Sequence, residues 1–210
     1  MYRILKSFKL VIVFLVLQSS LSFSSNIENS TNHIKTIVFG AGCFWSVEKK
    51  FQETFGVIDV ESGYADGANI KPLYKEIIKR ENRFNPDNYA EVVRVTYNNN
   101  KTNLENLLKT FFEMHDPTQE NRQGNDIGTQ YRSCIMPLNE KQENAARSKI
   151  VEMQDYFDKE IVTTIEEPIN FVIAEKYHHD YYERNPGQGY CMAVVGPKIS
   201  KIRQKFAHLY

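Results

Sequence analysis

The feature that most constrains this 210-residue chain is a cysteine placed where a strand pattern changes into a helix pattern. The β-branched run 36–39 is followed by three small residues and then, over 44–55, by apolar residues at helical spacing. Cys43 therefore lies at the start of a helix, where free backbone N–H groups favour a thiolate. We expect a substantial fraction of this thiol to be ionised at neutral pH. A small buried core residue is the alternative.

Two aromatic residues, Phe44 and Trp45, follow the cysteine directly, and Trp45 is the only tryptophan in the chain. Beside an activated thiol, such a pair would form a dry wall that receives an apolar group of a substrate. Plain core packing is the alternative for both rings. Gly56 ends the predicted helix.

Composition indicates one folded domain without a polyanionic partner. Hydrophobic residues make up 41% of the chain, and 26 basic side chains balance 26 acidic ones. This is enough apolar material for one core, so we expect a single catalytic domain over 36–210. The even charge balance predicts no binding to nucleic acid.

The N-terminus is predicted to be a targeting segment. Basic residues precede the apolar run 10–17, and small residues follow it, which is typical of a secretory signal peptide over residues 1–24. The run is shorter than the roughly 20 residues of a membrane span, which favours a cleaved signal peptide. An uncleaved anchor is the alternative. Residues 25–35 are predicted to form a flexible linker. We therefore expect an exported protein, periplasmic or secreted, that meets the membrane only if this segment is retained.

Strand and helix patterns follow one another irregularly through the domain. Alternation predicts strands at 57–62, 89–97, 130–136, 163–165 and 171–174. Helices are predicted from Leu73, from a capping box formed by Thr102 and Glu105, and from Asn139. This order predicts an α+β fold, a two-layer sandwich with a mixed, largely antiparallel sheet, helices packed against it and a long irregular C-terminal tail.

The cysteine count argues against a structural disulfide framework or a metal site. Three cysteines occur, with no Cys-x-x-Cys pair and no cysteine-histidine cluster. His178, His179 and Asp180 are adjacent residues that would point in different directions, so we expect no metal and no other cofactor.

Several motifs together resemble the peptide methionine sulfoxide reductase A family, and the likeness runs from about Ile37 to Phe206. They are Gly-Cys-Phe-Trp at 42–45, Ala-Glu-Val at 90–92, His-Asp-Pro-Thr at 115–118, Gln-Gly-Asn-Asp-Ile-Gly-Thr-Gln-Tyr-Arg-Ser at 123–133, and the segment 185–191. The resemblance implies reduction of methionine-S-sulfoxide, protein-bound and free, to methionine, which repairs oxidised proteins.

The family's motifs assign roles to individual residues here. The resemblance implies that Cys43 is the nucleophile and that Glu91 is an acid, which needs an apolar setting that raises its pKa. It also implies that Tyr74 and Tyr131 donate hydrogen bonds to the sulfoxide oxygen and that Asp126 orders this cluster.

The same resemblance implies how substrate binds and how the enzyme is reset. Phe44 and Trp45 would receive the methyl group on sulfur. Oxygen left on Cys43 as a sulfenic acid would be lost when Cys191, the resolving thiol, forms a disulfide with it. Thioredoxin or a thioredoxin-like protein would then reduce the Cys43–Cys191 disulfide. Cys134 is expected to be a packed thiol.

Other functions fit part of the same sequence. A thiol peroxidase or disulfide exchanger could use the same two cysteines, and an exported binding module could be stabilised by a bond between them. The polar loop 79–88 also departs from the family pattern, because Asn88 and Tyr89 stand where glycine and histidine are usual. How this loop positions Glu91 is left open by the sequence.

Overall fold

The computed structural model describes residues 33–197, 199 and 200. The predicted signal peptide at 1–24 and most of the predicted linker at 25–35 lie outside the described residues. Within the described ranges, no helix has both the length and the apolar character that crossing a membrane requires.

A six-stranded sheet forms the centre of the domain, with the order β7-β6-β1-β3-β2-β8. Its strands are β1 (Ile34–Ala41), β2 (Val57–Ala65), β3 (Ala90–Asn98), β6 (Ser133–Met136), β7 (Thr164–Ile165) and β8 (Val172–Ile173). The pairs β2–β3, β1–β6 and β2–β8 are antiparallel, whereas β6–β7 is parallel. A separate short hairpin joins β4 (Arg122–Gln123) to β5 (Asp126–Ile127). The prediction of a mixed, largely antiparallel sheet with helices packed against it is confirmed.

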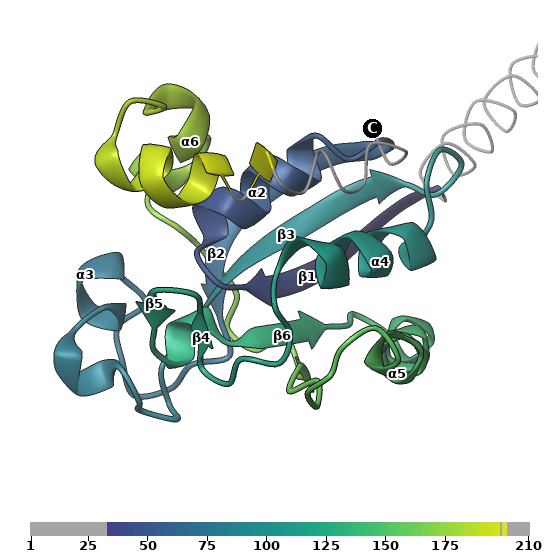
Figure 1. Ribbon diagram of the computed structural model, residues 1–210, viewed down its shortest axis with the longest axis horizontal. Helices are drawn as coiled ribbons and strands as arrows, with labels where there is room; N and C mark the ends of the chain where they lie inside the picture. Colours follow the sequence, from purple (N-terminus) through teal and green to yellow (C-terminus); the bar gives the residue numbers. More distant parts are fainter. Residues whose placement is uncertain (1–32, 198, 201–210) are drawn as a thin grey trace, which may run out of the picture. The chain divides into compact units, whose positions relative to one another are not determined.

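The longer helices are α2 (Phe44–Gln52), α4 (Leu104–Met114) and α5 (Glu140–Gln154) (Figure 1). Shorter turns are α3 (Tyr74–Ile77), α6 (Tyr181–Arg184), the 3₁₀ turns η1 (Arg80–Asn82), η2 (Thr129–Tyr131) and η3 (Lys176–His178), and a π-helical turn η4 (Cys191–Val195). Asn139 caps α5 as predicted, because its side chain accepts the backbone N–H of Gln142 at 3.0 Å.

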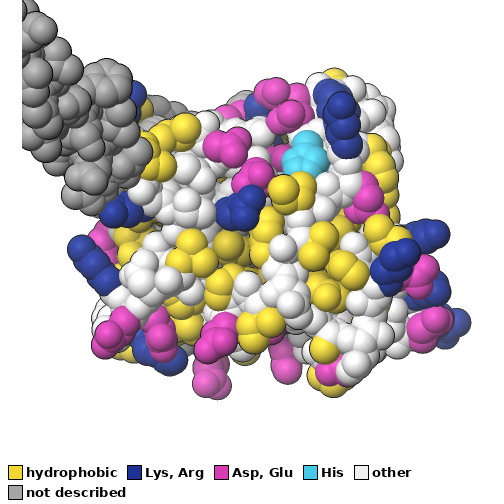
Figure 2. All heavy atoms as spheres, turned by 180° about the vertical axis from the view of Figure 1, so that it is seen from behind, with side chains coloured by type: hydrophobic (Ala, Val, Ile, Leu, Met, Phe, Trp, Pro, Cys, Tyr) yellow, Lys and Arg dark blue, Asp and Glu magenta, His cyan; other side chains and the backbone are white. Residues whose placement is uncertain are grey.

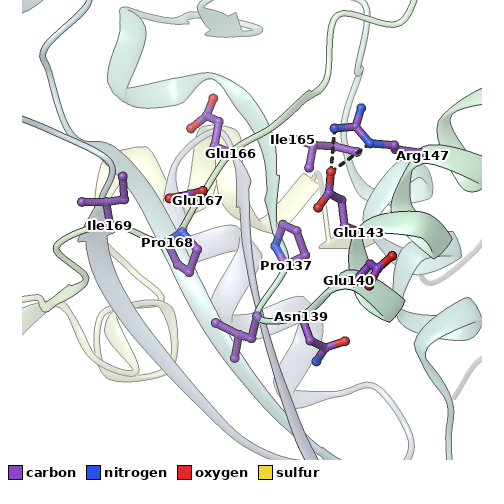
Figure 3. Close-up of a pocket in the computed structure, with 11 residues that line it drawn as sticks. Pro137, Asn139, Glu140, Glu143, Arg147, Ile165, Glu166, Glu167, Pro168 and Ile169 are labelled. Atoms are coloured by element: carbon purple, nitrogen blue, oxygen red, sulfur yellow. Dashed lines mark hydrogen bonds and ion pairs between the residues drawn. The ribbon is translucent and has the colours of Figure 1, made fainter.

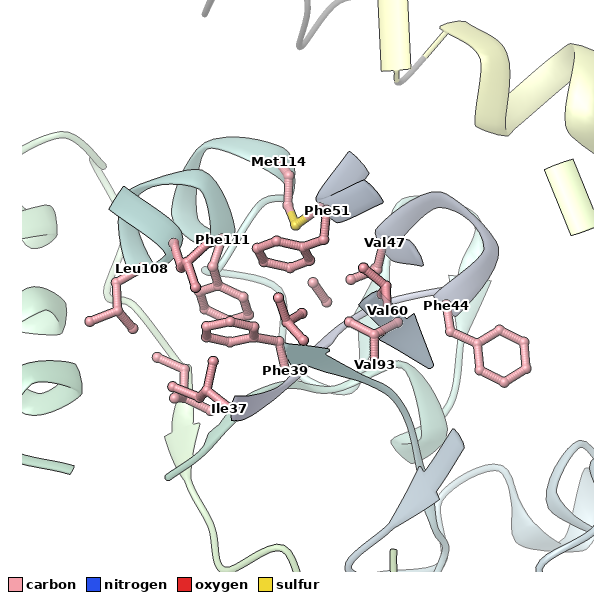
Figure 4. Packing of buried hydrophobic residues seen from close by; sticks show 14 of the residues in the cluster. Ile37, Phe39, Phe44, Val47, Phe51, Val60, Val93, Leu108, Phe111 and Met114 are labelled. Carbon is pink, nitrogen blue, oxygen red and sulfur yellow. The ribbon is translucent and has the colours of Figure 1, made fainter. Parts of the chain in front are cut away.

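Helices α2 and α4 meet over the middle of β1, where Phe39 is fully buried. Its ring stacks on Phe51 of α2 and on Phe111 of α4, with centroid distances of 5.0 and 5.1 Å (Figure 4). Val93 and Val95 of β3 extend the same core. This packing fixes the first turn of α2 against the strands that carry the candidate site.

The opposite face of the sheet carries a smaller core, which includes Val38, Val92 and Met136 with Phe171 packed against it. Viewed from behind, apolar side chains spread over the middle of the molecule and charged side chains lie mostly around its margin (Figure 2). The sheet is thus buried on both faces, which explains why a polar side chain in β3 can be withdrawn from water.

Three local predictions are wrong in detail. Helix α2 ends at Gln52, so Phe55 lies outside it and is 64% exposed. Helix α4 is capped by Asn103, which accepts the N–H of Asn106 at 2.9 Å; Thr102 is buried instead, so the predicted capping box does not form. The strand predicted from Gln130 begins only at Ser133, because residues 129–131 form the turn η2.

Candidate active site

A cavity of about 240 Å³ brings together residues from distant parts of the chain. It is lined by Cys43, Phe44, Trp45, Tyr74, Glu91, Asp126, Tyr131, Gln188 and Tyr190. Of the site residues predicted from the sequence, only Cys191 is missing from this lining. Gln188 and Tyr190 were not predicted, although they belong to the segment 185–191 that carries part of the resemblance.

Cys43 is placed by a tight turn between β1 and α2. Gly42 has φ +85°, and a Cβ there would lie 2.6 Å from the side chain of Gln123, so glycine is required on both counts. Cys43 then forms the N-cap of α2 without a side-chain cap of its own. Cys43 is 8% exposed and lines the cavity.

Glu91 lies in β3 on the face that packs under α2. Alternation along the strand puts it on the same side as Val93 and Val95, and it is 2% exposed. Its Oε2 accepts the backbone N–H of Phe44 at 3.1 Å. Burial raises the pKa of Glu91 to about 8, although the Phe44 hydrogen bond opposes this and the nearby Asp126 adds to it. The carboxyl group is therefore mostly protonated at neutral pH, as an acid catalyst requires.

The thiol does not follow the expectation from its position at the helix start. Burial raises the pKa of Cys43 well above its usual range, and the negative charges of Glu91, when it is ionised, and of Asp126 raise it further. Hydrogen bonds from the Trp45 N–H and the Tyr190 hydroxyl lower it without outweighing burial. The prediction of a substantially ionised thiol is wrong for this structure, in which Cys43 holds its proton.

The two predicted phenols enter the cavity from short turns. Tyr74 begins α3, where its N–H donates to Oε1 of Glu175 at 2.9 Å, and Tyr131 ends η2. Burial, together with the charge of Glu91, raises the pKa of both phenols, so both hydroxyls remain available as donors.

Asp126 stands at the start of β5 and faces Tyr190, whose hydroxyl donates to its Oδ2 at 2.5 Å. Burial raises the pKa of Tyr190. Tyr190 also lines the cavity beside Cys43 and interacts with the thiol, so it lies between the carboxyl group of Asp126 and the sulfur.

The aromatic wall is held from outside by the C-terminal segment. The Trp45 Nε1 donates to Nδ1 of His178 at 3.0 Å, and Tyr181 stacks flat on the indole with a centroid distance of 3.7 Å. Burial lowers the pKa of His178 to about 4, so its ring is neutral and can accept this bond. In the part of the chain that the structure describes, no group of three or more His, Cys, Asp or Glu residues could hold a metal ion.

The other two cysteines lie outside the cavity. Cys191 begins the π-helical turn η4, where it is fully buried and its N–H is bonded to Oε1 of Gln188 at 3.0 Å. Cys134 is buried in β6 as a packed thiol, as expected, close to Gly40. All three cysteines are free thiols in this structure.

Arg132 connects the loops that carry the site residues. Its guanidinium donates to the backbone carbonyls of Asp66, Asn88 and Thr129 at 3.1 Å each, and it forms ion pairs with the side chains of Asp66 and Glu166. These contacts tie together the end of β2, the start of β3 and the turn η2, which positions Tyr131.

Asn88 secures the loop that precedes β3. Its amide donates to the carbonyls of Ile77 at 3.1 Å and Asn82 at 3.0 Å, and the residue is fully buried. The loop 79–88 therefore closes on itself through this side chain, and Glu91 follows three residues later.

A larger hollow of about 630 Å³ lies between residues 137–147 and 165–169. It is lined by apolar and acidic side chains, with Glu143 paired to Arg147 at 2.7 Å (Figure 3). It contains no cysteine, and the clustered sequence motifs lie elsewhere. Its greater size therefore does not make it the better candidate site.

A cysteine thiol, a buried carboxyl group and two phenols around a small aromatic-walled cavity provide a nucleophile and hydrogen-bond donors, the groups that an oxidoreductase acting on sulfur requires. The peptide methionine sulfoxide reductase family model matches residues 35–210. A peptide methionine sulfoxide reductase MsrA from Deinococcus radiodurans is 46% identical over 171 residues, which cover 80% of this chain and 81% of that protein. The chain belongs to the peptide methionine sulfoxide reductase family.

Solved structures agree with this assignment. Reduced Mxr1 from Saccharomyces cerevisiae has a TM-score of 0.68 and 32% identity, covering 76% of this chain and 90% of its own. Methionine sulfoxide reductase A of Corynebacterium diphtheriae has a TM-score of 0.64 and 32% identity, covering 77% and 79%. A structure of yeast Mxr1 in complex with Trx2 matches at 24% identity, with a TM-score of 0.50 and coverage of 71% and 86%.

We predict that Arg132→Lys lowers the free energy of unfolding by about 2 kcal/mol, because lysine keeps the charge but cannot make all the contacts of the half-buried guanidinium. Urea unfolding would measure the change. Arg122→Lys is the matched control, since Arg122 is exposed and its guanidinium donates to the carbonyl of Gly124, two residues away. An equal effect of the two substitutions would contradict the role given to Arg132.

Proposed function

We propose that this enzyme reduces methionine-S-sulfoxide, in proteins and as the free amino acid, with Cys43 as the nucleophile. The observation that carries the proposal is the cavity itself, in which the buried carboxyl group of Glu91 lines the same space as the Cys43 thiol and two phenols; burial raises the pKa of Glu91 to about 8. A sulfoxide is attacked at sulfur only when its oxygen is hydrogen-bonded or protonated. The cavity supplies a donor for this oxygen and a nucleophile for the sulfur.

The substrate methyl group is received by the wall of Phe44 and Trp45. With the methyl group held there, the sulfoxide oxygen is bound by Tyr74 and Tyr131, as in an oxyanion site. A bulkier substituent on sulfur would be rejected by the limited volume of the cavity.

The reactive state for oxygen transfer has an ionised sulfur on Cys43 and a proton on Glu91. The thiolate of Cys43 attacks the substrate sulfur while Glu91 gives its proton to the sulfoxide oxygen. The oxygen then passes to the Cys43 sulfur, and the bonds from the substrate sulfur to oxygen and to Cys43 both break. The products are methionine, a sulfenic acid on Cys43 and an ionised Glu91. The two electrons that reduce the sulfoxide come from the cysteine sulfur.

The second half of the reaction involves Cys191. Its thiol displaces water from the sulfenic acid to form the Cys43–Cys191 disulfide, which an exported thioredoxin-like dithiol then reduces. The complex of yeast Mxr1 with Trx2 supports a partner of this class. Because Cys191 is fully buried outside the cavity, this step requires the turn η4 to rearrange.

We also propose that the protein is exported. The support is the sequence alone, in which basic residues precede the apolar run 10–17. The intact mass of protein recovered from outside the cytoplasm would test this, and a mass that includes residues 1–24 would contradict cleavage.

Cys43→Ser is predicted to abolish reduction of a methionine sulfoxide peptide with dithiothreitol, because the hydroxyl is a far weaker nucleophile. Cys134→Ser is the control and should retain turnover. Cys191→Ser should still form one methionine per enzyme but lose turnover with thioredoxin. Turnover by Cys43→Ser would refute the assigned nucleophile, and activity on hydroperoxide alone would favour a thiol peroxidase.

The pH profile of kcat/KM is predicted to rise by about tenfold per pH unit and to level off near pH 8. The reactive state holds one proton on Glu91 and none on Cys43, so it appears only when the pair has lost its first proton. Since the pKa of Glu91 is the lower of the two, this loss occurs near pH 8. Glu91→Gln removes that ionisation, and an unchanged rate and midpoint in this variant would exclude Glu91 as the acid.

A further inference from the structure

A second buried carboxyl group, Glu48, lies close to the site and has no part in the proposed reaction. It stands one turn after Trp45 on α2, and it is 2% exposed. Its Oε2 accepts the backbone N–H of Asp180 at 2.9 Å. A carboxyl group buried this far from water is costly unless its contacts are specific, so its position calls for an explanation.

The Asp180 backbone is the point at which the C-terminal segment turns onto α2. Asp180 has φ +52°, in the left-handed region, and it precedes the four-residue helix α6. Tyr181, the next residue, is the side chain that stacks on Trp45. Holding the N–H of Asp180 therefore fixes the start of the element that covers the indole.

Other contacts between α2 and this segment are more exposed. Gln52 donates to Oδ1 of Asp180 at 2.7 Å, and Lys49 pairs with Glu183, whose side chain is 56% exposed. Exposed ion pairs contribute little to stability. The buried bond from Asp180 to Glu48 is the one that water competes with least.

We infer that Glu48 is a positioning residue that fixes Trp45 in the wall of the substrate cavity by holding Asp180 and, through it, Tyr181. The inference rests on the proposed function, because the wall is assigned there to the substrate methyl group. Loss of this contact would loosen the indole without removing any group that reacts.

The charge state of Glu48 makes the contact sensitive to pH. Burial raises the pKa of Glu48 to about 7. The groups that face the carboxyl are Ser62 from β2, His179, whose Nδ1 lies 3.9 Å from Oε1, and the charged side chains of Asp180 and Arg184. The hydroxyl of Ser62 and the hydrogen bond from the Asp180 N–H oppose this rise without outweighing burial. A carboxyl whose pKa is raised by burial favours its buried position below the ordinary pKa of about 4.5, and this support is lost as pH rises towards 7.

The test uses the fluorescence of Trp45, the only tryptophan of the chain. In Glu48→Ala we expect emission at longer wavelength and stronger quenching by iodide, because Tyr181 no longer covers the indole. KM for a methionine sulfoxide peptide should rise about tenfold while kcat changes by less than about threefold, as expected for lost binding that is equal in the ground and transition states. Glu183→Gln is the control, because Glu183 is an exposed carboxyl group that pairs with Lys49 where α6 meets α2. Its emission, iodide quenching and KM should match those of the wild type.

Glu48→Gln keeps an acceptor oxygen for Asp180 but cannot ionise. Between pH 5.5 and 7.5 its emission should therefore change much less than wild-type emission, which should shift to longer wavelength as pH rises. The ionisation of Glu91 near pH 8 in the same cavity should affect both proteins alike. Unchanged emission and KM in Glu48→Ala, or the same pH dependence in wild type and Glu48→Gln, would overturn the inference. The fluorescence needs no turnover, so a wild-type protein without reductase activity would refute the proposed function and leave this test of Glu48 intact.

Discussion

The burial of one carboxyl group under the first turn of α2 is the interaction on which the site depends. Glu91 receives a single backbone N–H, from Phe44, which is enough to hold its position but not enough to offset the desolvation that keeps it protonated. If further N–H groups were aimed at it, the pKa would fall and the acid would be lost. The surrounding core, with Phe39 stacked between α2 and α4, is what keeps this turn close above β3.

The start of α2 serves two groups at once. The N–H of Phe44 donates to Glu91, and the N–H of Trp45 donates to the sulfur of Cys43. A proton moved from Cys43 to Glu91 therefore leaves the negative charge within the same turn, where the helix dipole favours it in either position. In the proposed reaction, a thiol with a raised pKa can therefore still supply a thiolate once Glu91 has lost its own proton, because the Cys43 proton then passes to the vacant carboxylate.

Local patterns were sufficient for most strands and for the cap of α5, because alternation and capping depend on residues close in sequence. The predicted cap of α4, Thr102, is one residue before the actual cap, Asn103. Both residue types can cap a helix, and Thr102 is instead packed against Gly56, a contact that the local sequence does not show. Tyr131 was assigned to a strand because nothing in its own segment shows that the following residue, Arg132, binds three loops.

Contacts between distant parts of the chain escaped prediction. His178 meets Trp45 and Asp180 meets Glu48 over separations of 133 and 132 residues, and no periodicity reports such pairs. The family motifs could identify most residues of the cavity but gave Tyr190 no role.

The position of Cys191 divides the proposed reaction into two structural stages. The cavity is complete without this cysteine, so oxygen transfer does not require it to move. Its thiol is buried in a π-helical turn directly after Tyr190, which bonds to Asp126 and to the sulfur of Cys43. In the proposed second half of the reaction, Cys191 has to reach a sulfur beside which Tyr190 now lies, so we expect Tyr190 to leave the cavity as the disulfide forms. Because Tyr190 lines this cavity, its departure would also open the proposed substrate site.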